Sequence, residues 1–387
     1  MRTTRVIHWL HKWTGLISGI NVLILSVTGS YLVFDVDINR AFAAPKGAVV
    51  LTIDPHGATP YQTAIDGIVA LHPNVKPTML YRSKHEDNSY DFGFAGGEGA
   101  GAYRLNMVTG EVYPVTAGKA AGFNRFIFML HDNLFLGKTG SIFLGVVGIL
   151  FLVSTVTGIF IYGPFMKPAL SGVLRWDRGA RHYTAELHKM LGCLSLAFNV
   201  IIGVTGTVLT LAIIGTRAWF GTALLHAAEG GAALPAGAPL QAVDTVIQRG
   251  AAMQPGRTFF TVTYPSSLQG PNFYFCGYNK NDSITRGIPA PILVPVTPGG
   301  DVRIVPVPLW VKATYLCIPL HFGDFAGWGM KIVYCFFGLS SGVLSISGAI
   351  LSVMGWTKRW RVGRRMRRRA RKGRPLGLSA KTEGQEA

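Results

Sequence analysis

Long apolar stretches without charge alternate with charged segments along the chain. Four such stretches contain no Asp, Glu, Lys or Arg, and each exceeds the ~20 residues that a helix needs to cross the bilayer core. A fifth uncharged run, Thr258–Asn279, contains two prolines among β-branched and aromatic residues, which is typical of strands and turns. The pattern therefore predicts four transmembrane helices, over Trp13–Phe34, Thr139–Met166, Met190–Thr216 and Ile332–Thr357.

The composition supports a membrane protein. Of 387 residues, 49% are hydrophobic and only 14% are charged, whereas a soluble domain carries roughly 25% charged residues. This balance excludes a disordered chain, a coiled coil and a small disulfide scaffold. The four cysteines form no C-x-x-C or C-x-x-C-H motif, which argues against a zinc ribbon, a thioredoxin-type site and covalently attached c-type haem.

Positive charge is concentrated on one side of the predicted membrane. The N-terminus, the loop between spans two and three and the C-terminal tail together carry 20 Lys and Arg against 4 Asp and Glu, whereas the remainder carries 17 against 15. Positive loops stay in the cytoplasm, so both termini are expected there. The basic run Lys358–Arg374 is explained by this rule and by contact with anionic lipid, and no nucleic acid is expected.

An internal repeat divides the chain into two similar halves. His11–Gly29 and His188–Gly206 align without a gap and share the opening His-Lys, a glycine four residues later and a closing Val-Thr-Gly. The segments around spans two and four also align without a gap, so that His131 matches His321. Such repeats are common in membrane bundles. Because span one has an internal copy, we expect it to remain in the protein, although Ala41–Ala43 resembles a signal cleavage site.

The repeat selects four of the ten histidines as candidate ligands of a metal. His11 and His188 begin spans one and three on the cytoplasmic side, and His131 and His321 precede spans two and four on the outer side. Ionisable side chains at membrane depth are costly and usually functional. Two neutral imidazoles on facing helices can be the axial ligands of a haem iron. The pattern predicts two b-type haems, one for each histidine pair.

Small residues and one alternative ligand complete this hypothesis. Gly15 and Gly192 follow the inner histidines by four residues, on the same helix face, and would leave room for a flat macrocycle. His8 shares a helix face with His11 and stays an alternative inner ligand, although it has no match in the repeat. Interfacial anchoring of each histidine and a non-haem metal are the other interpretations. No carboxylate or cysteine recurs beside the histidines, which favours haem.

Each outer loop is predicted to form a small α+β module. Periodic segments at Pro60–Leu71 and Pro239–Ala252 indicate one helix in each loop. Neither loop contains a catalytic motif, and without a Rossmann fingerprint the chain is not expected to bind NAD(P)H or flavin. Cys276 and Cys317 are not expected to form an essential disulfide. The predicted strands are Thr78–Arg82, Ser89–Phe94, Tyr103–Met107 and Glu111–Val115, followed by Thr258–Tyr264, Asn272–Tyr278 and Pro291–Val296.

From Arg5 to about Trp360 the chain resembles the PepSY-associated transmembrane family. The resemblance lies in the H-K-W-T-G and H-K-M-L-G starts, the L-H pairs before spans two and four, and the modules, the first of which closes with V-T-G-E-V. It is similar to the branch of dihaem siderophore-iron reductases in the bacterial inner membrane. The resemblance implies an oxidoreductase with two haem b groups, whose axial ligands are His11, His188, His131 and His321.

The resemblance also implies electron transfer across the membrane. A quinol or a separate cytoplasmic reductase would donate the electron, and a ferric siderophore in the periplasm would accept it and release iron. One haem near each face divides a bilayer core of ~30 Å into shorter steps. The alternative is a non-enzymatic PepSY-type sensor or peptidase regulator. The siderophore, the electron donor and the oligomeric state stay open.

The sequence therefore predicts a mainly α membrane protein, with four transmembrane helices as a tandem two-helix repeat and two small PepSY-like α+β periplasmic modules. The predicted boundaries are 1–35 (cytoplasmic N-terminus and helix one), 36–125 (module one), 126–166 (outer histidine segment and helix two), 167–187 (cytoplasmic loop), 188–216 (helix three), 217–318 (module two), 319–357 (outer histidine segment and helix four) and 358–387 (basic cytoplasmic tail).

Overall fold

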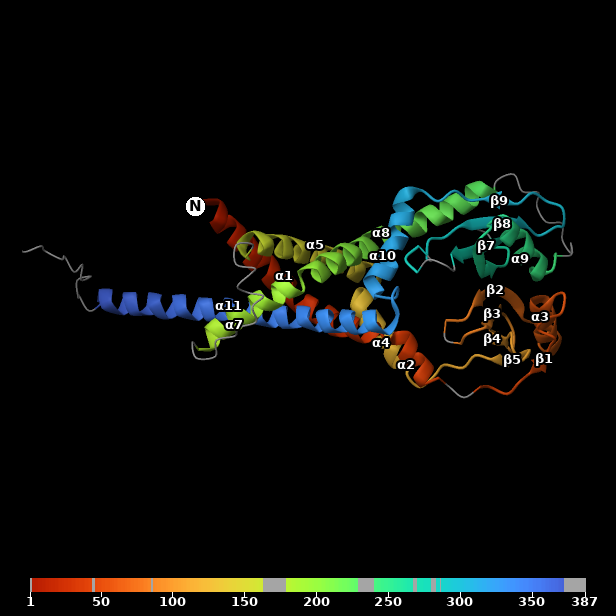
Figure 1. Cartoon of the computed structure of the whole chain (residues 1–387), viewed down its shortest axis with the longest axis horizontal. Helices are drawn as coiled ribbons and strands as arrows, with labels where there is room; N and C mark the ends of the chain where they lie inside the picture. Colours follow the sequence, from red (N-terminus) through yellow and green to blue (C-terminus); the bar gives the residue numbers. More distant parts are fainter. Residues whose placement is uncertain are drawn as a thin grey trace, which may run out of the picture.

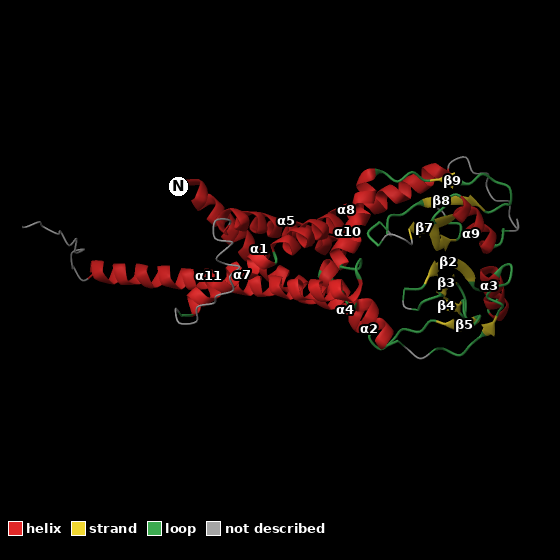
Figure 2. Cartoon of the chain, viewed as in Figure 1, coloured by secondary structure: helices red, strands yellow, loops and turns green. Residues whose placement is uncertain are grey.

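A bundle of long helices carries a β-sheet at one of its ends (Figures 1 and 2). The structure is a computed structural model, and it describes residues 2–43, 46–84, 86–162, 179–228, 240–266, 270–279, 283–285 and 287–371. The bundle contains α1 (Arg2–Leu32), α5 (Gly137–Tyr162), α7 (Ala180–Leu194), α8 (Leu196–Ala228) and α11 (Gly327–Arg371). We call the bundle end next to the sheet the sheet end, and the end where α1 begins and α11 finishes the terminus end (Figure 1).

Within the described residues, three helices are long and apolar enough to cross a membrane by themselves: Thr3–Leu32, Gly137–Tyr162 and Gly327–Arg364. The third predicted span is a broken one. Helices α7 and α8 meet at Ser195 with a bend of 67°, and together they make a fourth candidate span. The sequence predicts one uninterrupted helix here, so the structure changes the shape of this span. The total of four spans holds when the bent pair counts as one.

Hydroxyl and amide groups explain the position of this bend. The Ser195 hydroxyl donates to the carbonyl of Leu191 at 2.7 Å and accepts from the Asn199 amide at 2.9 Å. Back-bonding of this kind competes with the helical ladder and bends helices. Asn199 Oδ1 in turn accepts a 2.6 Å hydrogen bond from Ser341 on α11. The bend is therefore tied to the neighbouring helix.

Hydroxyl side chains are frequent inside the bundle, and large apolar side chains cover its outside. Ser18, Thr205 and Ser347 are among the most buried side chains of the long helices, whereas Ile20 and Phe160 are more than 60% exposed. Without water, helices associate through small and hydroxyl residues, and the large apolar side chains face lipid. Helix α1 packs against α5 and α11, α5 packs against α8, and α11 packs against α7. This distribution fits a bilayer environment.

Short helices connect the spans to the sheet at the sheet end. Helix α2 (Asp35–Ala41) follows α1, α4 (Ala121–Asn133) precedes α5, and α10 (Leu309–Phe322) precedes α11. Helices α4 and α10 each end at a residue with positive φ, Leu134 and Gly323. The outer histidine segments are thus separate helices, turned away from the spans that follow them.

Nine strands of the described chain form one antiparallel sheet, in the order β1-β5-β4-β3-β2-β6-β7-β8-β9. The sequence predicts two separate modules, but β2 and β6 pair directly, with Leu80 opposite Val262, and join them. The strands are β1 (Leu51–Thr52), β2 (Lys76–Arg82), β3 (Ser89–Ala95), β4 (Gly101–Asn106), β5 (Glu111–Pro114), β6 (Arg257–Thr263), β7 (Asn272–Asn279), β8 (Pro291–Pro295) and β9 (Arg303–Ile304).

Two helices cover one face of this sheet. Helix α3 (Pro60–Leu71) has the predicted bounds, and α9 begins at Val243 and ends at Ala252. Their N-termini cap each other, because the Asp244 carboxylate accepts from the backbone N–H groups of Tyr61 and Gln62, and the Gln62 side chain accepts from Val243 N–H. Leu80, Val262 and the other buried side chains beneath the two helices form one core that spans both modules.

The opposite face of the sheet anchors it to the bundle. The last turns of α8 pack Leu224 against Leu293 and Val305. The Arg303 guanidinium donates to the carbonyl of Ala227, near the end of α8. Helix α8 therefore runs without interruption from the bundle to the sheet. All four cysteines are free.

Candidate functional site

The four histidines selected by the repeat meet as two pairs inside the bundle. The imidazole centroids of His11 and His188 lie 6.4 Å apart, and those of His131 and His321 lie 6.3 Å apart. Each pair takes one ring from each half of the chain, because His11 is on α1, His188 on α7, His131 on α4 and His321 on α10. The structure therefore brings together the residues that the sequence paired.

The spacing of each pair suits one metal ion between two rings. An imidazole nitrogen binds a first-row metal such as zinc at about 2.0–2.1 Å and lies roughly 1.1 Å from its ring centroid, so two opposed rings on one ion have centroids about 6.3 Å apart. Both observed separations agree with this value. Among the described residues no group of three or more His, Cys, Asp and Glu could hold a metal without further ligands. The donor set therefore fits a metal that brings further ligands of its own, such as a haem iron, better than a metal held by protein ligands alone.

The outer rings are held by threonine hydroxyls in one tautomer. His131 Nδ1 lies 2.9 Å from Thr28 Oγ1, and His321 Nδ1 lies 3.0 Å from Thr205 Oγ1. Each threonine already donates its only hydroxyl proton to a backbone carbonyl of its own helix, at 2.7 Å. The hydroxyl must then accept, so Nδ1 carries the proton of each ring. Nε2 is left with a free lone pair, which is the form that binds a metal.

The inner rings follow the same rule with different partners. His11 Nδ1 lies 2.8 Å from the carbonyl oxygen of Ser154, an atom that can only accept. His188 Nδ1 lies 2.8 Å from Ser347 Oγ, whose proton goes to the carbonyl of Leu344 at 3.0 Å. Again Nδ1 is the donor and Nε2 is free. Hydrogen bonds of this type orient histidine ligands and raise their basicity.

A glycine lies against each ring. A Cβ atom built on Gly29 would lie 2.9 Å from His131 Cε1, and one on Gly206 would lie 2.9 Å from His321 Cε1. A Cβ on Gly158 would approach His11 Cε1, and one on Gly348 would approach His188 Cε1, each at 3.3 Å. Larger side chains at these glycines would displace the imidazoles.

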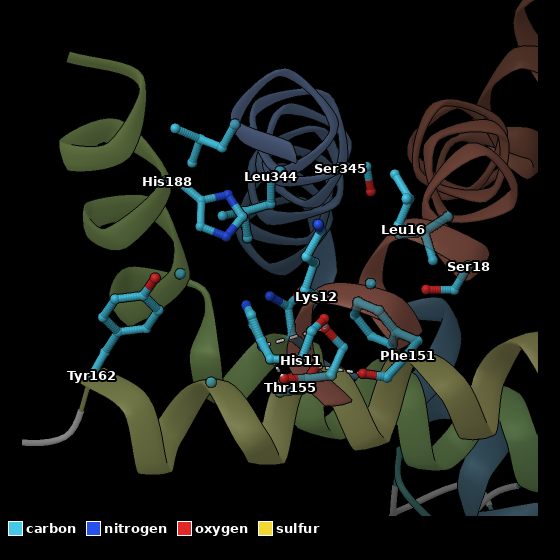
Figure 3. Close-up of a pocket in the computed structure, with 18 of the residues that line it drawn as sticks. His11, Lys12, Leu16, Ser18, Phe151, Thr155, Tyr162, His188, Leu344 and Ser345 are labelled. Atoms are coloured by element: carbon cyan, nitrogen blue, oxygen red, sulfur yellow. Dashed lines mark hydrogen bonds between the residues drawn. The ribbon is translucent and has the colours of Figure 1, made fainter. Parts of the chain in front are cut away.

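Two cavities contain the histidine pairs. The inner cavity has a volume of ≈ 420 Å³ and is lined by His11, His188, Gly15 and Gly192 among others. Figure 3 shows the two imidazoles and the Tyr162 ring around it. The outer cavity, of ≈ 780 Å³, is lined by His131, His321 and residues of all four spans. Each cavity thus offers space beside a pair of rings.

The alternative ligand His8 lies at the rim of the inner cavity. It is exposed and lines the same cavity, but the ring that faces His188 belongs to His11. The glycines that the sequence selected, Gly15 and Gly192, form part of the cavity wall. A Cβ on Gly192 would meet only Leu344, at 3.8 Å, so a small side chain could be accommodated at this position.

A thin layer of residues separates the two cavities. Val22, Phe151, Asn199 and Ser341 line both. In the repeat Val22 matches Asn199 and Phe151 matches Ser341, so one half supplies apolar side chains and the other a hydrogen-bonded polar pair. The histidine sites lie far apart on either side of this layer. On α1, His11 and Thr28, the partner of His131, are 17 residues or about 25 Å apart.

Sequence reasoning missed the groups that hold the rings. Thr28 and Thr205, with the glycines that follow them, are the Val-Thr-Gly motif that closes the first repeat segment. The motif was visible as a shared ending, and its contact with the histidines of another helix was not. Thr157 and Ser347 are also matched, and Thr157 Oγ1 lies 3.4 Å from His11 Nδ1.

Comparisons with known proteins identify the family of this chain. A comparison with curated proteins gives no match. The sequence matches the PepSY-associated TM region over residues 8–359, a range that contains all four histidines, both cavities and the whole sheet. Because the match covers most of the chain, the protein belongs to the PepSY-associated transmembrane family.

Proposed function

We propose that this protein is a transmembrane oxidoreductase that holds two b-type haems and reduces a ferric siderophore outside the membrane. The observation that carries the proposal is that all four histidines have their hydrogen-bond partner at Nδ1, which assigns one tautomer to all of them. In each ring Nδ1–H is used by a hydroxyl or carbonyl, and Nε2 is free beside a second imidazole. Four independent hydrogen bonds with the same outcome are expected for metal ligands, and interfacial anchors would not need them.

The roles of the side chains follow from this arrangement. When bound, haem supplies the one-electron chemistry that side chains lack. Each histidine pair would hold one haem, and ligation by two imidazoles would favour electron transfer over oxygen chemistry. The hydroxyls of Thr28, Thr205 and Ser347 and the carbonyl of Ser154 fix the rings. The glycines that lie against the rings have no Cβ atom that would displace the imidazoles.

The direction of electron flow follows from the position of the sites. The inner site lies toward the terminus end and the outer site lies beside α4 and α10 at the sheet end (Figure 1). The charge bias of the sequence assigns the terminus end to the cytoplasm. A quinol or a separate cytoplasmic reductase would then donate at the inner site. The ferric chelate would accept at the sheet end, and its oxygen donors would release the softer Fe(II).

The haem content of the purified protein tests the first part of the proposal. We expect two haem b groups per chain by pyridine haemochrome assay after loading with haem. His11→Ala, His131→Ala, His188→Ala and His321→Ala should each retain about half of the absorbance, and His8→Ala should retain all of it. Loading that gives no haem would favour the sensor or peptidase-regulator alternative. Loss of haem in His8→Ala but not in His11→Ala would reassign the inner ligand.

Sided reduction tests the second part. In proteoliposomes with a reductant on the terminus side, the protein should reduce a ferric hydroxamate on the sheet side, detected with an Fe(II)-specific dye. His131→Ala should still allow reduction of its remaining haem but stop release of Fe(II). His11→Ala should release no Fe(II) when the reductant is on the terminus side. Its outer haem should still be reduced by a small reductant that is added on the sheet side. Equal Fe(II) release by all variants would exclude the proposed path.

A further inference from the structure

The inner cavity carries a matched pair of cationic side chains. Lys12 and Lys189 directly follow the inner histidines, align with each other in the repeat, and both line the cavity. Figure 3 shows Lys12 beside the His11 and His188 rings. We propose that Lys12 and Lys189 bind the two propionate carboxylates of the haem in the inner cavity. This inference rests on the proposed function and assigns an orientation to the group in that site.

The helix geometry directs both ammonium groups to the terminus end. Side chains on a helix lean toward its N-terminus, and α1 and α7 both begin at the terminus end (Figure 1). Aromatic rings flank the two ammonium groups. Lys12 Nζ lies 4.9 Å from the ring centroid of Trp356, and Lys189 Nζ lies 5.7 Å from that of Tyr162. The lysines therefore lie at the rim of the cavity, where the carboxylates of a buried macrocycle would emerge.

Within the part of the chain that the structure describes, no acidic side chain balances the positive charges of the inner cavity. The described residues that line this cavity include no Asp or Glu, and neither lysine forms a salt bridge with any of the residues that the structure describes. Two partly buried ammonium groups against an apolar wall favour two anionic partners. Haem b carries two carboxylates on one edge, so it matches the lysines in both number and sign. Hydrogen bonds between ammonium and carboxylate groups are among the stronger ones in proteins.

The outer cavity lacks this arrangement. Its cations, Lys138 and Arg217, occupy positions that do not match each other in the repeat, and Asp132 lines the same cavity. The inference is therefore restricted to the inner site. A lipid phosphate at the membrane surface is the other anion that could occupy the two lysines, and the experiment below separates it from a propionate.

Esterified haem provides the test. His131→Ala protein, in which only the inner site should load, is freed of haem and titrated with haem b or with its dimethyl ester, which lacks both carboxylate charges. We expect the parent to bind haem about tenfold more tightly than the ester for each lysine contact. Lys12→Gln with Lys189→Gln should bind the two compounds with similar affinity, and Lys12→Arg with Lys189→Arg should restore the preference.

The controls separate the explanations. Arg5→Gln removes a positive charge from α1 outside the cavity and should leave the preference for haem unchanged. Equal binding of haem and of the ester by the His131→Ala parent would overturn the inference. A preference for haem that persists in the double Gln variant would also overturn it, and loss of bound anionic phospholipid from that variant would then assign the lysines to lipid. Failure of the wild-type chain to bind either compound would overturn the proposed function instead.

Discussion

At the scale of single residues, the hydrogen-bond partner of Nδ1 decides whether Nε2 of a histidine is free to bind a metal. The sequence predicted the four histidines because their positions recur in both halves. It could not predict their hydroxyl partners, because Thr28 and Thr205 also make the ordinary hydrogen bond to a carbonyl four residues earlier. A threonine inside a membrane helix commonly does this. Only the packing of α4 and α10 against α1 and α8 shows that these hydroxyls also accept from imidazole.

Thr205→Val tests the hydroxyl that holds His321. The change keeps the shape of the side chain and removes the acceptor, so the ring loses its fixed tautomer. We expect haem affinity at the outer site to fall about 10–100-fold, measured by haem titration of the apoprotein. Thr205→Ser should retain most of the affinity. Thr210→Val, in the same cavity wall but bonded only to Gly206, should behave as wild type, and an equal loss in both Val variants would refute a specific role.

Glu86 predicts an acid sensitivity of the sheet. Burial by itself would raise the pKa of its carboxyl, but hydrogen bonds from Tyr113 and Asn106 and the Arg104 guanidinium outweigh it and lower the pKa below 4.5. A lowered pKa stabilises the fold above 4.5, and that stability is lost as the pH falls below 4.5. The thermal unfolding temperature should therefore drop as the pH falls below about 4.5.

In Glu86→Gln this drop should be smaller, because the side chain no longer titrates. Glu98→Gln, at an exposed position of the neighbouring loop, should keep the full pH dependence of the wild type. An unchanged pH profile in Glu86→Gln would mean that other carboxylates control the acid response.

At the scale of elements, the sequence predicts lengths better than shapes. Helices α3 and α5 lie within a few residues of their predicted bounds, because apolar period and run length determine them. The break at Ser195 was missed, since a serine with an asparagine four residues later does not distinguish a bend from an ordinary polar contact. The matched Ser18 also bonds back, to Thr14, in the unbroken α1. The broken span differs from α1 in the hydrogen bond that Asn199 accepts from Ser341 on α11.

Asn199→Val tests whether this hydrogen bond maintains the bend. Valine is the residue that the other half has at the matched position, Val22. The change removes the hydrogen bonds that the Asn199 side chain makes with the Ser195 and Ser341 hydroxyls, which keep their bonds to the carbonyls of Leu191 and Phe337. The loss of these two side-chain hydrogen bonds should cost about 1–3 kcal/mol. We expect a lower unfolding temperature in detergent. Asn21→Val, on the unbroken α1, should not lower it, and a stable Asn199→Val protein would assign the bend to the backbone alone.

At the scale of the whole molecule, the bundle presents opposite ends to two compartments. The sheet and the short helices α2, α4 and α10 are at one end, and the start of α1 and the finish of α11 are at the other (Figure 1). Charge alone gave the expected orientation. The single sheet could not be predicted, because the pairing of β2 with β6 joins strands from the two halves of the chain, and the local pattern of either strand does not identify its partner.

Cysteine labelling tests the orientation. Val108 is 67% exposed in a turn of the sheet, and Val362 is 52% exposed near the finish of α11. In a variant without the four native cysteines, a membrane-impermeant maleimide should label Val108→Cys in spheroplasts. It should label Val362→Cys only after the membrane is permeabilised. Labelling of both positions without permeabilisation would contradict the topology.

The pairing of β2 with β6 also joins two strands that are synthesised far apart in time. Roughly 175 residues separate the end of β2 from the start of β6. At about 5–20 residues per second, β2 waits roughly 9–35 s for its partner after leaving the ribosome. During that time the first module has an open strand edge, which is a site for aggregation. The newly made first half therefore needs protection outside the membrane, and a chain shortened after α5 would keep that edge permanently.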